Sequence, residues 1–225
     1  MVRQILTKNF IKLKADWDKA ALDTNFRDYI AQGYNEEGAF RRSGEDNTKG
    51  LRGFLKKFDV DWKDKRVVEL GCGAGRMTEF IANDASHVQA VDISAEMLKQ
   101  LHRRLGHKRN IETLCIIRDF SVISDLSTDI IISFLVFQHT PEDMVERLFQ
   151  DGHRILKPGG YYLFQIPLAK QHKCVPVNDA SALDMVYWTQ EEVREMATKY
   201  RYEIISEPDE GSGVQIFLFR KGGYR

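Results

Sequence analysis

The sequence predicts an α/β fold: a doubly wound sheet of seven strands, mostly parallel with an antiparallel last strand, plus an N-terminal helical lid. From residue 66 onward, short β-branched runs alternate with helical segments, which is typical of a parallel sheet covered on both faces. The apolar run Ile130-Ile131-Ile132 agrees, because strands buried on both faces are continuously apolar. The last two runs are joined by a short Gly-rich turn, which requires antiparallel neighbours.

The predicted strands follow from short apolar runs that end at polar or turn residues. They are expected at residues 66–70, 88–91, 113–117, 129–134, 161–166, 202–206 and 214–220. Ligands of open α/β sheets bind at the carboxyl ends of the strands, near the point where the strand order reverses. The residues that directly follow the first four strands are therefore the candidates for a site.

The predicted helices follow from apolar spacing and from capping signals. Residues 1 to about 60 are expected to be largely helical, and a short helix is expected over 76–83. Ser94 is the expected N-cap of the next helix. A further helix should begin at Thr140-Pro141, with Asp143 completing a capping-box-like pattern, and should stop at Pro158-Gly159-Gly160. Thr189 and Glu192 should form a capping box at the start of a last helix.

Charge and cysteine content narrow the functional classes. Lys plus Arg and Asp plus Glu both number 33, so no net charge favours nucleic acid or a membrane as partner. The three cysteines form no Cys-x-x-Cys pair and the six histidines show no metal-ligand spacing, so no metal is predicted. No apolar run is long enough to cross a bilayer, and the start does not resemble a signal peptide. We therefore expect a cytoplasmic protein, monomeric or homodimeric.

The stretch "VVELGCGAGR", residues 67–76, is a strand followed by a glycine-rich turn. Such turns let backbone N–H groups approach a ligand closely, often a pyrophosphate. Two residues argue against that ligand. The dinucleotide fingerprint needs a third small residue where this chain has Arg76, and the carboxylate of Glu69 repels a phosphate but attracts an ammonium group.

Acidic residues end the next two predicted strands. Asp92 ends the second strand and Asp119 follows the third. One carboxylate at such a position can accept both hydroxyls of a ribose, and the other can accept from the exocyclic amine of a base. A ligand that combines an ammonium, a ribose and an adenine without a phosphate is S-adenosylmethionine (SAM).

At these residues the sequence resembles the class I SAM-dependent methyltransferases. The resemblance rests on five motifs in order and covers roughly residues 50–220: "VVELGCGAGR" (67–76), "VQAVDIS" (88–94), "IIRDF" (116–120), "DIIISFLVFQHTP" (129–141) and "ILKPGGYYLFQIP" (155–167). It implies a Rossmann-like methyltransferase domain over residues 51–225, with residues 1–50 as a helical lid on the acceptor side. It also implies SAM as cofactor and S-adenosylhomocysteine as product.

The resemblance assigns cofactor-binding residues by position. Glu69, Gly71 and Gly73 would hold the methionine part, Asp92 the ribose and Asp119 the adenine amine. For Met97 we expect packing on the apolar face of its helix, with an adenine contact as an addition. The implied cofactor set is Glu69, Gly71, Cys72, Gly73, Gly75, Asp92, Ile93, Met97, Asp119, Phe120 and Leu135.

The acceptor side is less sharply defined. His139, just past the fourth strand, is the candidate general base, with a packing or hydrogen-bonding role as the alternative. The predicted substrate-binding residues are Trp17, Tyr29, Tyr34, His139 and His172, and ordinary packing is the alternative for each aromatic residue.

Elimination favours an enzyme that transfers a methyl group by in-line displacement to a small-molecule acceptor. The sequence after the fourth strand lacks the Asp/Asn-Pro-Pro-aromatic motif of amino-directed nucleic-acid methyltransferases, and a paired-glutamate loop typical of arginine methyltransferases is also missing. The main alternative is a non-catalytic SAM-binding or partner-binding subunit with the same fold. An aminopropyltransferase would need an acidic pocket, which the segment after the fourth strand does not provide. A nicotinamide dehydrogenase is disfavoured by Glu69 and Arg76.

Overall fold

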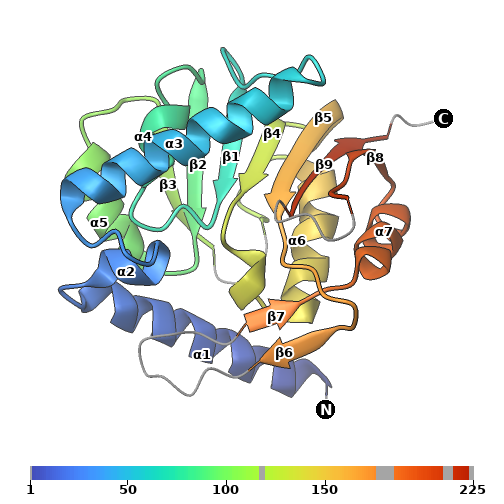
Figure 1. The fold of residues 1–225 in the computed structure, drawn as a ribbon, viewed down its shortest axis with the longest axis horizontal. Helices are drawn as coiled ribbons and strands as arrows, with labels where there is room; N and C mark the ends of the chain where they lie inside the picture. Colours follow the sequence, from blue (N-terminus) through green and yellow to red (C-terminus); the bar gives the residue numbers. More distant parts are fainter. Residues whose placement is uncertain (1, 117–119, 176–184, 210–214, 223–225) are drawn as a thin grey trace. The chain divides into compact units, whose positions relative to one another are not determined.

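A computed structural model describes residues 2–116, 120–175, 185–209 and 215–222 of the chain (Figure 1). The chain divides into two compact units, residues 11–116 and residues 1–10 with 117–225. No helix in the described ranges combines the length and the apolar character that a membrane crossing needs. Asp119 and the turn at 211–213 lie outside the described residues.

The unit of residues 11–116 contains the N-terminal helices and three parallel strands. β1 pairs with β2 and β2 with β3, both in parallel, so that Glu69 lies opposite Ala90 and Asp92 opposite Cys115. In Figure 1, α3 runs across these strands. The elements are α1 (Val2–Leu22, of which 11–22 belong here), α2 (Phe26–Ile30), α3 (Glu37–Lys56), β1 (Arg66–Leu70), α4 (Thr78–Ile81), β2 (His87–Asp92), α5 (Ala95–Leu105) and β3 (Ile111–Cys115).

Helix α5 packs on the sheet as its apolar spacing predicts. Leu98, Leu101 and Leu105 are buried against Cys72 and Ala90 in one cluster. The helix begins where the sequence predicts it. The Ser94 hydroxyl accepts a hydrogen bond from the Met97 N–H at 3.1 Å, which satisfies one of the N–H groups that a helix leaves open at its start.

The other unit carries the remaining strands of the main sheet. β5 pairs in parallel with β4 and antiparallel with β9, which in turn pairs antiparallel with β8. α6 packs on β5, and α7 lies beside β8 (Figure 1). The elements are β4 (Thr128–Ser133), the 3-10 helix η1 (Phe137–His139), α6 (Glu142–Ile155), β5 (Leu156–Gln165), β6 (Lys173–Val175), β7 (Met185–Tyr187), α7 (Gln190–Lys199), β8 (Tyr202–Ser206) and β9 (Ile216–Lys221).

The core of this second unit is aromatic. Phe149 of α6 lies 5.0 Å from Phe164 of β5 and 6.0 Å from Phe219 of β9, measured between ring centroids. Phe137 and Tyr162 belong to the same cluster and are fully buried. Large rings bury much apolar area at low entropic cost, so this cluster fixes α6 on the strands.

The predicted fold class is confirmed. The strands follow the order β3-β2-β1-β4-β5-β9-β8 in one seven-stranded sheet, which is mostly parallel and in which β9 is antiparallel to both of its neighbours. Thr189 and Glu192 form the predicted capping box of α7, with the Thr189 hydroxyl accepting from the Glu192 N–H and the Glu192 carboxylate accepting from the Thr189 N–H. The sequence therefore specifies both the architecture and several helix ends.

Several local predictions are wrong. The helix expected over 76–83 is only Thr78–Ile81, because residues 72–77 are used by the turn. α6 has no capping box at Asp143, and its N-cap is Pro141. The third strand spans Ile111–Cys115 instead of 113–117. A small β6–β7 hairpin, which the sequence analysis did not predict, follows β5.

The Pro158-Gly159-Gly160 stretch does not stop α6, which ends at Ile155. It lies within β5, where the pairing with β4 shifts: Thr128 faces Leu156 and Ile130 faces Tyr161. The stretch is thus an irregularity in a strand, a position that tolerates both proline and glycine.

Candidate cofactor site

The glycine-rich turn after β1 is built from left-handed backbone. Gly71, Gly73 and Gly75 have φ angles of 71°, 52° and 81°, a region that L side chains rarely adopt. A Cβ on Gly75 would lie 2.8 Å from the Leu101 side chain, so this glycine also allows α5 to approach the turn. The third glycine of this motif therefore performs the close packing that the dinucleotide fingerprint gives to its own third small residue.

Asp92, the last residue of β2, fixes this turn. One carboxylate oxygen accepts the Gly73 N–H at 2.8 Å, and the other accepts the Ser94 N–H at 2.8 Å. The side chain is buried, and burial raises the pKa of Asp92 to about 6 against the opposing effect of these hydrogen bonds. Each carboxylate oxygen keeps a further lone pair for a ligand hydroxyl.

Glu69 lies next to this turn with one carboxylate oxygen unsatisfied. Its side chain is buried, and its Oε2 atom has no hydrogen-bond partner within the described part of the chain. Burial raises the pKa of Glu69 to about 7, with Thr78 and Arg76 opposing that shift and Asp92 adding to it. A buried carboxylate oxygen without a donor costs free energy that an ammonium ligand would recover.

Arg76 is the first residue of the helix that was expected over 76–83, but it lies before that helix begins. It lies in the turn and is only 4% exposed. Its Nη1 donates to Asn47 at 2.5 Å and to Ser43 at 3.3 Å, both on α3. None of the ion pairs among the described residues includes Arg76, and burial lowers its pKa. The signal that could have found it is arginine at a fingerprint position reserved for small residues.

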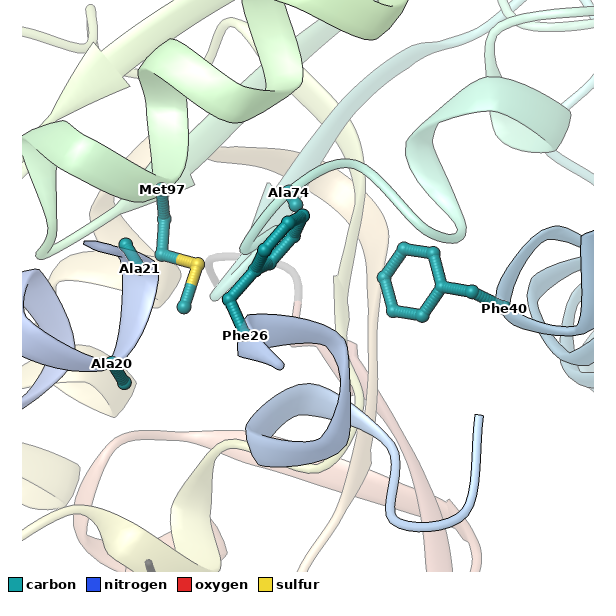
Figure 2. Close-up of a cluster of buried hydrophobic side chains, with 6 residues drawn as sticks. All are labelled: Ala20, Ala21, Phe26, Phe40, Ala74 and Met97. Carbon is teal, nitrogen blue, oxygen red and sulfur yellow. The ribbon is translucent and has the colours of Figure 1, made fainter. Parts of the chain in front are cut away.

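The N-terminal helices pack directly on the turn. Figure 2 shows one apolar cluster formed by α1, α2, α3, the turn and α5. A Cβ on Gly73 would lie 3.3 Å from Ile30, the last residue of α2. The buried members of the cluster are Ala20, Ala21, Phe26, Phe40, Ala74 and Met97, with Trp17, Tyr29 and Ile30 packed against them.

Two of the predicted aromatic residues in this unit pack against the cluster, and a third does not. Trp17 and Tyr29 are half-buried against it, and Tyr34 is 44% exposed and acts electrostatically on Arg76. Ile93, which follows Asp92, is half-buried, and its carbonyl accepts a contact from the Cys115 thiol at 3.5 Å. Their roles toward a substrate or cofactor stay predictions.

Asp18 of α1 is a residue that sequence reasoning missed. Its carboxylate accepts from the Ser94 hydroxyl at 2.7 Å and from the Glu96 N–H at 3.4 Å. It therefore adds an acceptor at the positive end of α5. Although burial acts in the opposite direction, hydrogen bonds from Lys14 and Ser94 hold the pKa of Asp18 below its usual value.

The remaining predicted residues belong to the unit of residues 117–225. Phe120 is fully buried, with its N–H donating to Asp151 at 3.3 Å. Leu135 has a left-handed φ of 61°, and its N–H donates to Gln165 at 3.3 Å. A non-glycine residue held in this region stores strain, which is common at functional sites. His139 ends η1 and is half-buried.

His172 lies between two glutamates. Its Nε2 is 2.7 Å from Glu142 at the start of α6, and its Nδ1 is 3.2 Å from Glu192 at the start of α7. The ring also meets Trp188 edge-on, with centroids 5.1 Å apart. These contacts hold the segment before β6 against both helices.

Comparison with protein families matches residues 67–160 to a family described as "Methyltransferase domain". That range contains the glycine turn and Asp92, and the fold around it is the predicted one. In the sequence of this domain and in its fold, the chain resembles the class I SAM-dependent methyltransferases. The methyl donor of this family is SAM, which agrees with the predicted cofactor.

Two curated relatives illustrate how far the similarity extends. Phosphoethanolamine N-methyltransferase of Triticum aestivum is 33% identical over 106 residues, covering 46% of this chain and 21% of that protein. Trans-aconitate 2-methyltransferase of Rhodopseudomonas palustris is 31% identical over 125 residues, covering 55% of this chain and 46% of that protein. The matches thus span about a fifth to a half of these relatives.

Solved structures share the fold of this chain. Magnesium protoporphyrin IX methyltransferase of Synechocystis, solved with bound SAM, aligns with a TM-score of 0.69 at 12% identity, covering 95% of this chain and 97% of that one. A SAM-dependent methyltransferase of Leishmania major aligns with a TM-score of 0.69 at 13% identity, covering 94% and 82%. At these identities the similarity concerns the fold.

The raised pKa of Glu69 predicts a pH dependence of stability. Between about pH 4.5 and 7 the folded state holds a proton on Glu69 that the unfolded state has released, so the free energy of unfolding falls as pH rises. Glu69→Gln removes this titration. Without ligand, the free energy of unfolding of wild type should fall between pH 5.5 and pH 8 by about 2 kcal/mol more than that of the variant. Urea unfolding of both proteins at the two pH values measures this difference. An equal change in the free energy of unfolding of the two proteins would contradict the prediction.

Proposed function

We propose that this methyltransferase transfers the methyl group of SAM to a small-molecule acceptor by in-line displacement. The observation that carries the proposal is the buried Glu69 carboxylate, with an oxygen that has no partner in the described part of the chain, beside a glycine turn held by Asp92. This charge suits the ammonium group of an amino acid and repels a phosphate.

The residues in and around the glycine turn suit both the amino-acid end and the nucleoside end of such a cofactor. Glu69 would hold the ammonium group, and the buried guanidinium of Arg76 would hold the carboxylate of the same amino acid. The glycine turn would let the chain of the methionine approach the backbone. Asp92 would accept the ribose hydroxyls, and Ile93, Met97 and Phe120 would contact the adenine, with Asp119 at its amine.

The protein's contribution to the reaction is binding, orientation and exclusion of water. The sulfonium of SAM supplies the reactivity when it is bound, so no protein nucleophile is needed. Residues 1–50 would act as a lid over the cofactor turn, which is supported by the packing of Phe40 and Ala74 in one cluster. His139 would remove a proton from acceptors that must be deprotonated.

The class of acceptor is supported by relatives of known name. They include the phosphoethanolamine and trans-aconitate methyltransferases already described, and a solved 1,6-didemethyltoxoflavin-N1-methyltransferase of Burkholderia thailandensis. The balanced charge of the chain adds no preference for a polyanion. We propose Trp17, Tyr29, Tyr34, His139 and His172 as the residues that line the acceptor side.

Incubation with methyl-labelled SAM tests this function. A cell extract is divided by size into small molecules, RNA and protein, and each fraction is offered separately. We expect label in the small-molecule fraction with wild type and none with the Asp92→Asn variant. Label confined to the RNA or protein fraction would contradict the acceptor class. Tight binding of S-adenosylhomocysteine without transfer to any fraction would favour the non-catalytic alternative.

A further inference from the structure

The peptide that joins Ala74 to Gly75 in the cofactor turn is held from both sides. Arg104, in the last turn of α5, donates from Nη1 to the Ala74 carbonyl at 2.6 Å. The Gly75 N–H donates to the Cys72 carbonyl at 2.9 Å. A turn with three glycines has much conformational freedom, so its shape depends on such external restraints. The Arg104 bond is charge-assisted and is therefore the stronger of the two.

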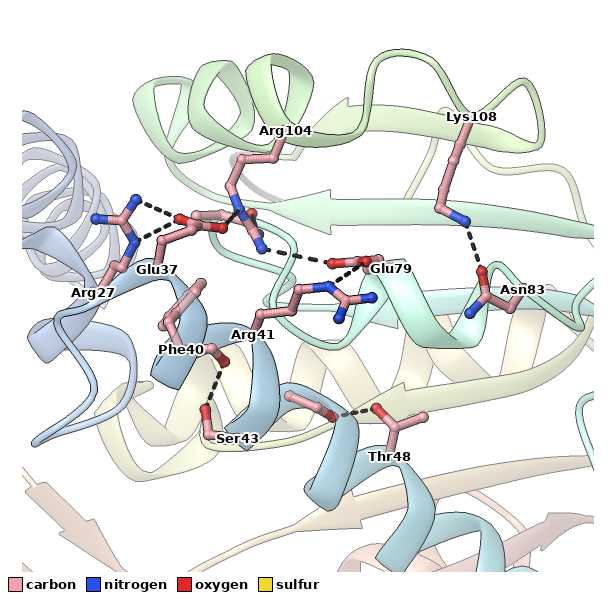
Figure 3. Close-up of polar contacts among 12 residues, drawn as sticks. Arg27, Glu37, Phe40, Arg41, Ser43, Thr48, Glu79, Asn83, Arg104 and Lys108 are labelled. Carbon is pink, nitrogen blue, oxygen red and sulfur yellow. Dashed lines mark hydrogen bonds and ion pairs between the residues drawn. The ribbon is translucent and has the colours of Figure 1, made fainter.

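Arg104 is in turn held by the N-terminal helices. Its Nε lies 3.1 Å from Glu37 at the start of α3, and its guanidinium lies 5.2 Å from the centre of the buried Phe40 ring. Glu37 also accepts from Arg27 of α2 at 3.0 Å (Figure 3). Glu79 of α4 lies 3.8 Å from the Arg104 Nη2. One guanidinium thus links the turn to α2, α3 and α4.

This arrangement requires arginine. The side chain of Arg104 is only 13% exposed and contacts a carbonyl, two carboxylates and a ring at the same time. A planar group with five N–H donors can do this, whereas a lysine ammonium at the end of a flexible stem cannot. The Glu37 side chain is half exposed, so the link is open to solvent at its lid end.

We propose that Arg104 is a positioning residue for cofactor binding. It holds the Ala74 carbonyl in the shape that the cofactor needs, and Glu37 holds Arg104 in place when the N-terminal helices are docked. Docking of these helices and the binding shape of the turn are therefore coupled. The inference rests on the proposed function because it concerns the same turn.

A double-mutant cycle tests this coupling. The dissociation constant of S-adenosylhomocysteine is measured by calorimetry for wild type, Arg104→Lys, Glu37→Gln and the double variant. We expect each single variant to bind about tenfold more weakly and the double variant to bind no more weakly than Arg104→Lys. The exposed pair Arg194 and Glu207 is the matched control, because it is a two-bond arginine–carboxylate contact in the other unit. Arg194→Lys should leave the constant unchanged.

A second readout needs no cofactor. Hydrogen exchange of the turn amides in the ligand-free protein should become faster in both Arg104→Lys and Glu37→Gln, and should stay unchanged in Arg194→Lys. If both variants lower the melting temperature but keep wild-type affinity and wild-type exchange at the turn, Arg104 is only structural and the inference is overturned. If wild type binds no S-adenosylhomocysteine, the proposed function fails, and the exchange comparison still decides the inference.

Discussion

Asp92→Asn is expected to weaken binding of SAM and S-adenosylhomocysteine by at least about a hundredfold, which corresponds to about 3 kcal/mol. The Asp92 carboxylate already accepts the N–H groups of Gly73 and Ser94 at 2.8 Å each. An asparagine turns one of these acceptors into a donor that faces another donor. The variant therefore disturbs the turn and also removes half of the charge-assisted acceptor that we propose for the ribose hydroxyls.

The control for this variant is an acidic residue on the neighbouring strand whose side chain lies at the surface. Glu112 of β3 contacts Gln89 at 3.0 Å and His87 at 3.3 Å, and its side chain is 48% exposed. Glu112→Gln should bind S-adenosylhomocysteine like wild type. Calorimetric affinities of the two variants within a factor of three of each other would contradict the role of Asp92.

Gly44→Ala is expected to destabilise the protein by about 3 kcal/mol, the largest effect that we expect from a single added methyl group. An added Cβ would lie 2.1 Å from the Arg76 carbonyl oxygen and 2.8 Å from its carbonyl carbon. Both are backbone atoms, which cannot swing aside, so α3 must move away from the turn. Because Ser43 and Asn47 hold the Arg76 side chain, the same shift should weaken cofactor binding.

Helix α3 offers its own matched control. Gly50 lies on the same helix, and a Cβ there would meet nothing within 4 Å. Gly50→Ala should stabilise the protein by up to about 1 kcal/mol, because glycine is a poor residue in a helix interior. Chemical denaturation of the two variants should thus give shifts of opposite sign. Equal shifts would show that α3 does not approach Arg76 closely.

Local signals in the sequence explain why so much of the fold is predictable. β1 and β8 lie at the predicted residues, 66–70 and 202–206, because β-branched and apolar runs bounded by turn residues are local features. The N-cap Ser94 and the capping box of α7 depend on side chains only three residues apart. The glycine turn and Asp92 could be predicted as candidate site residues because their spacing along the chain is a local signal.

The missed features depend on contacts distant in sequence. The burial of Arg76 depends on α3, and the cap that Asp18 gives to α5 crosses 76 residues. In the sequence, Arg104 is an ordinary basic residue at a helix end. Only the structure shows its hydrogen bond to Ala74. The irregular start of β5 shows the same limit, since the pairing with β4 overrides the usual effect of Pro158.

Binding of S-adenosylhomocysteine to the purified protein at pH 8 tests the central claim most directly, namely that the turn at Glu69 to Gly75 with Asp92 holds an amino-acid nucleoside. At this pH Glu69 is ionised and can pair with the ammonium group, since its pKa is about 7. We predict saturable one-to-one binding in a calorimetric titration, weakened by Glu69→Gln, and no binding of NADH under the same conditions. Binding of NADH without binding of S-adenosylhomocysteine would contradict the account.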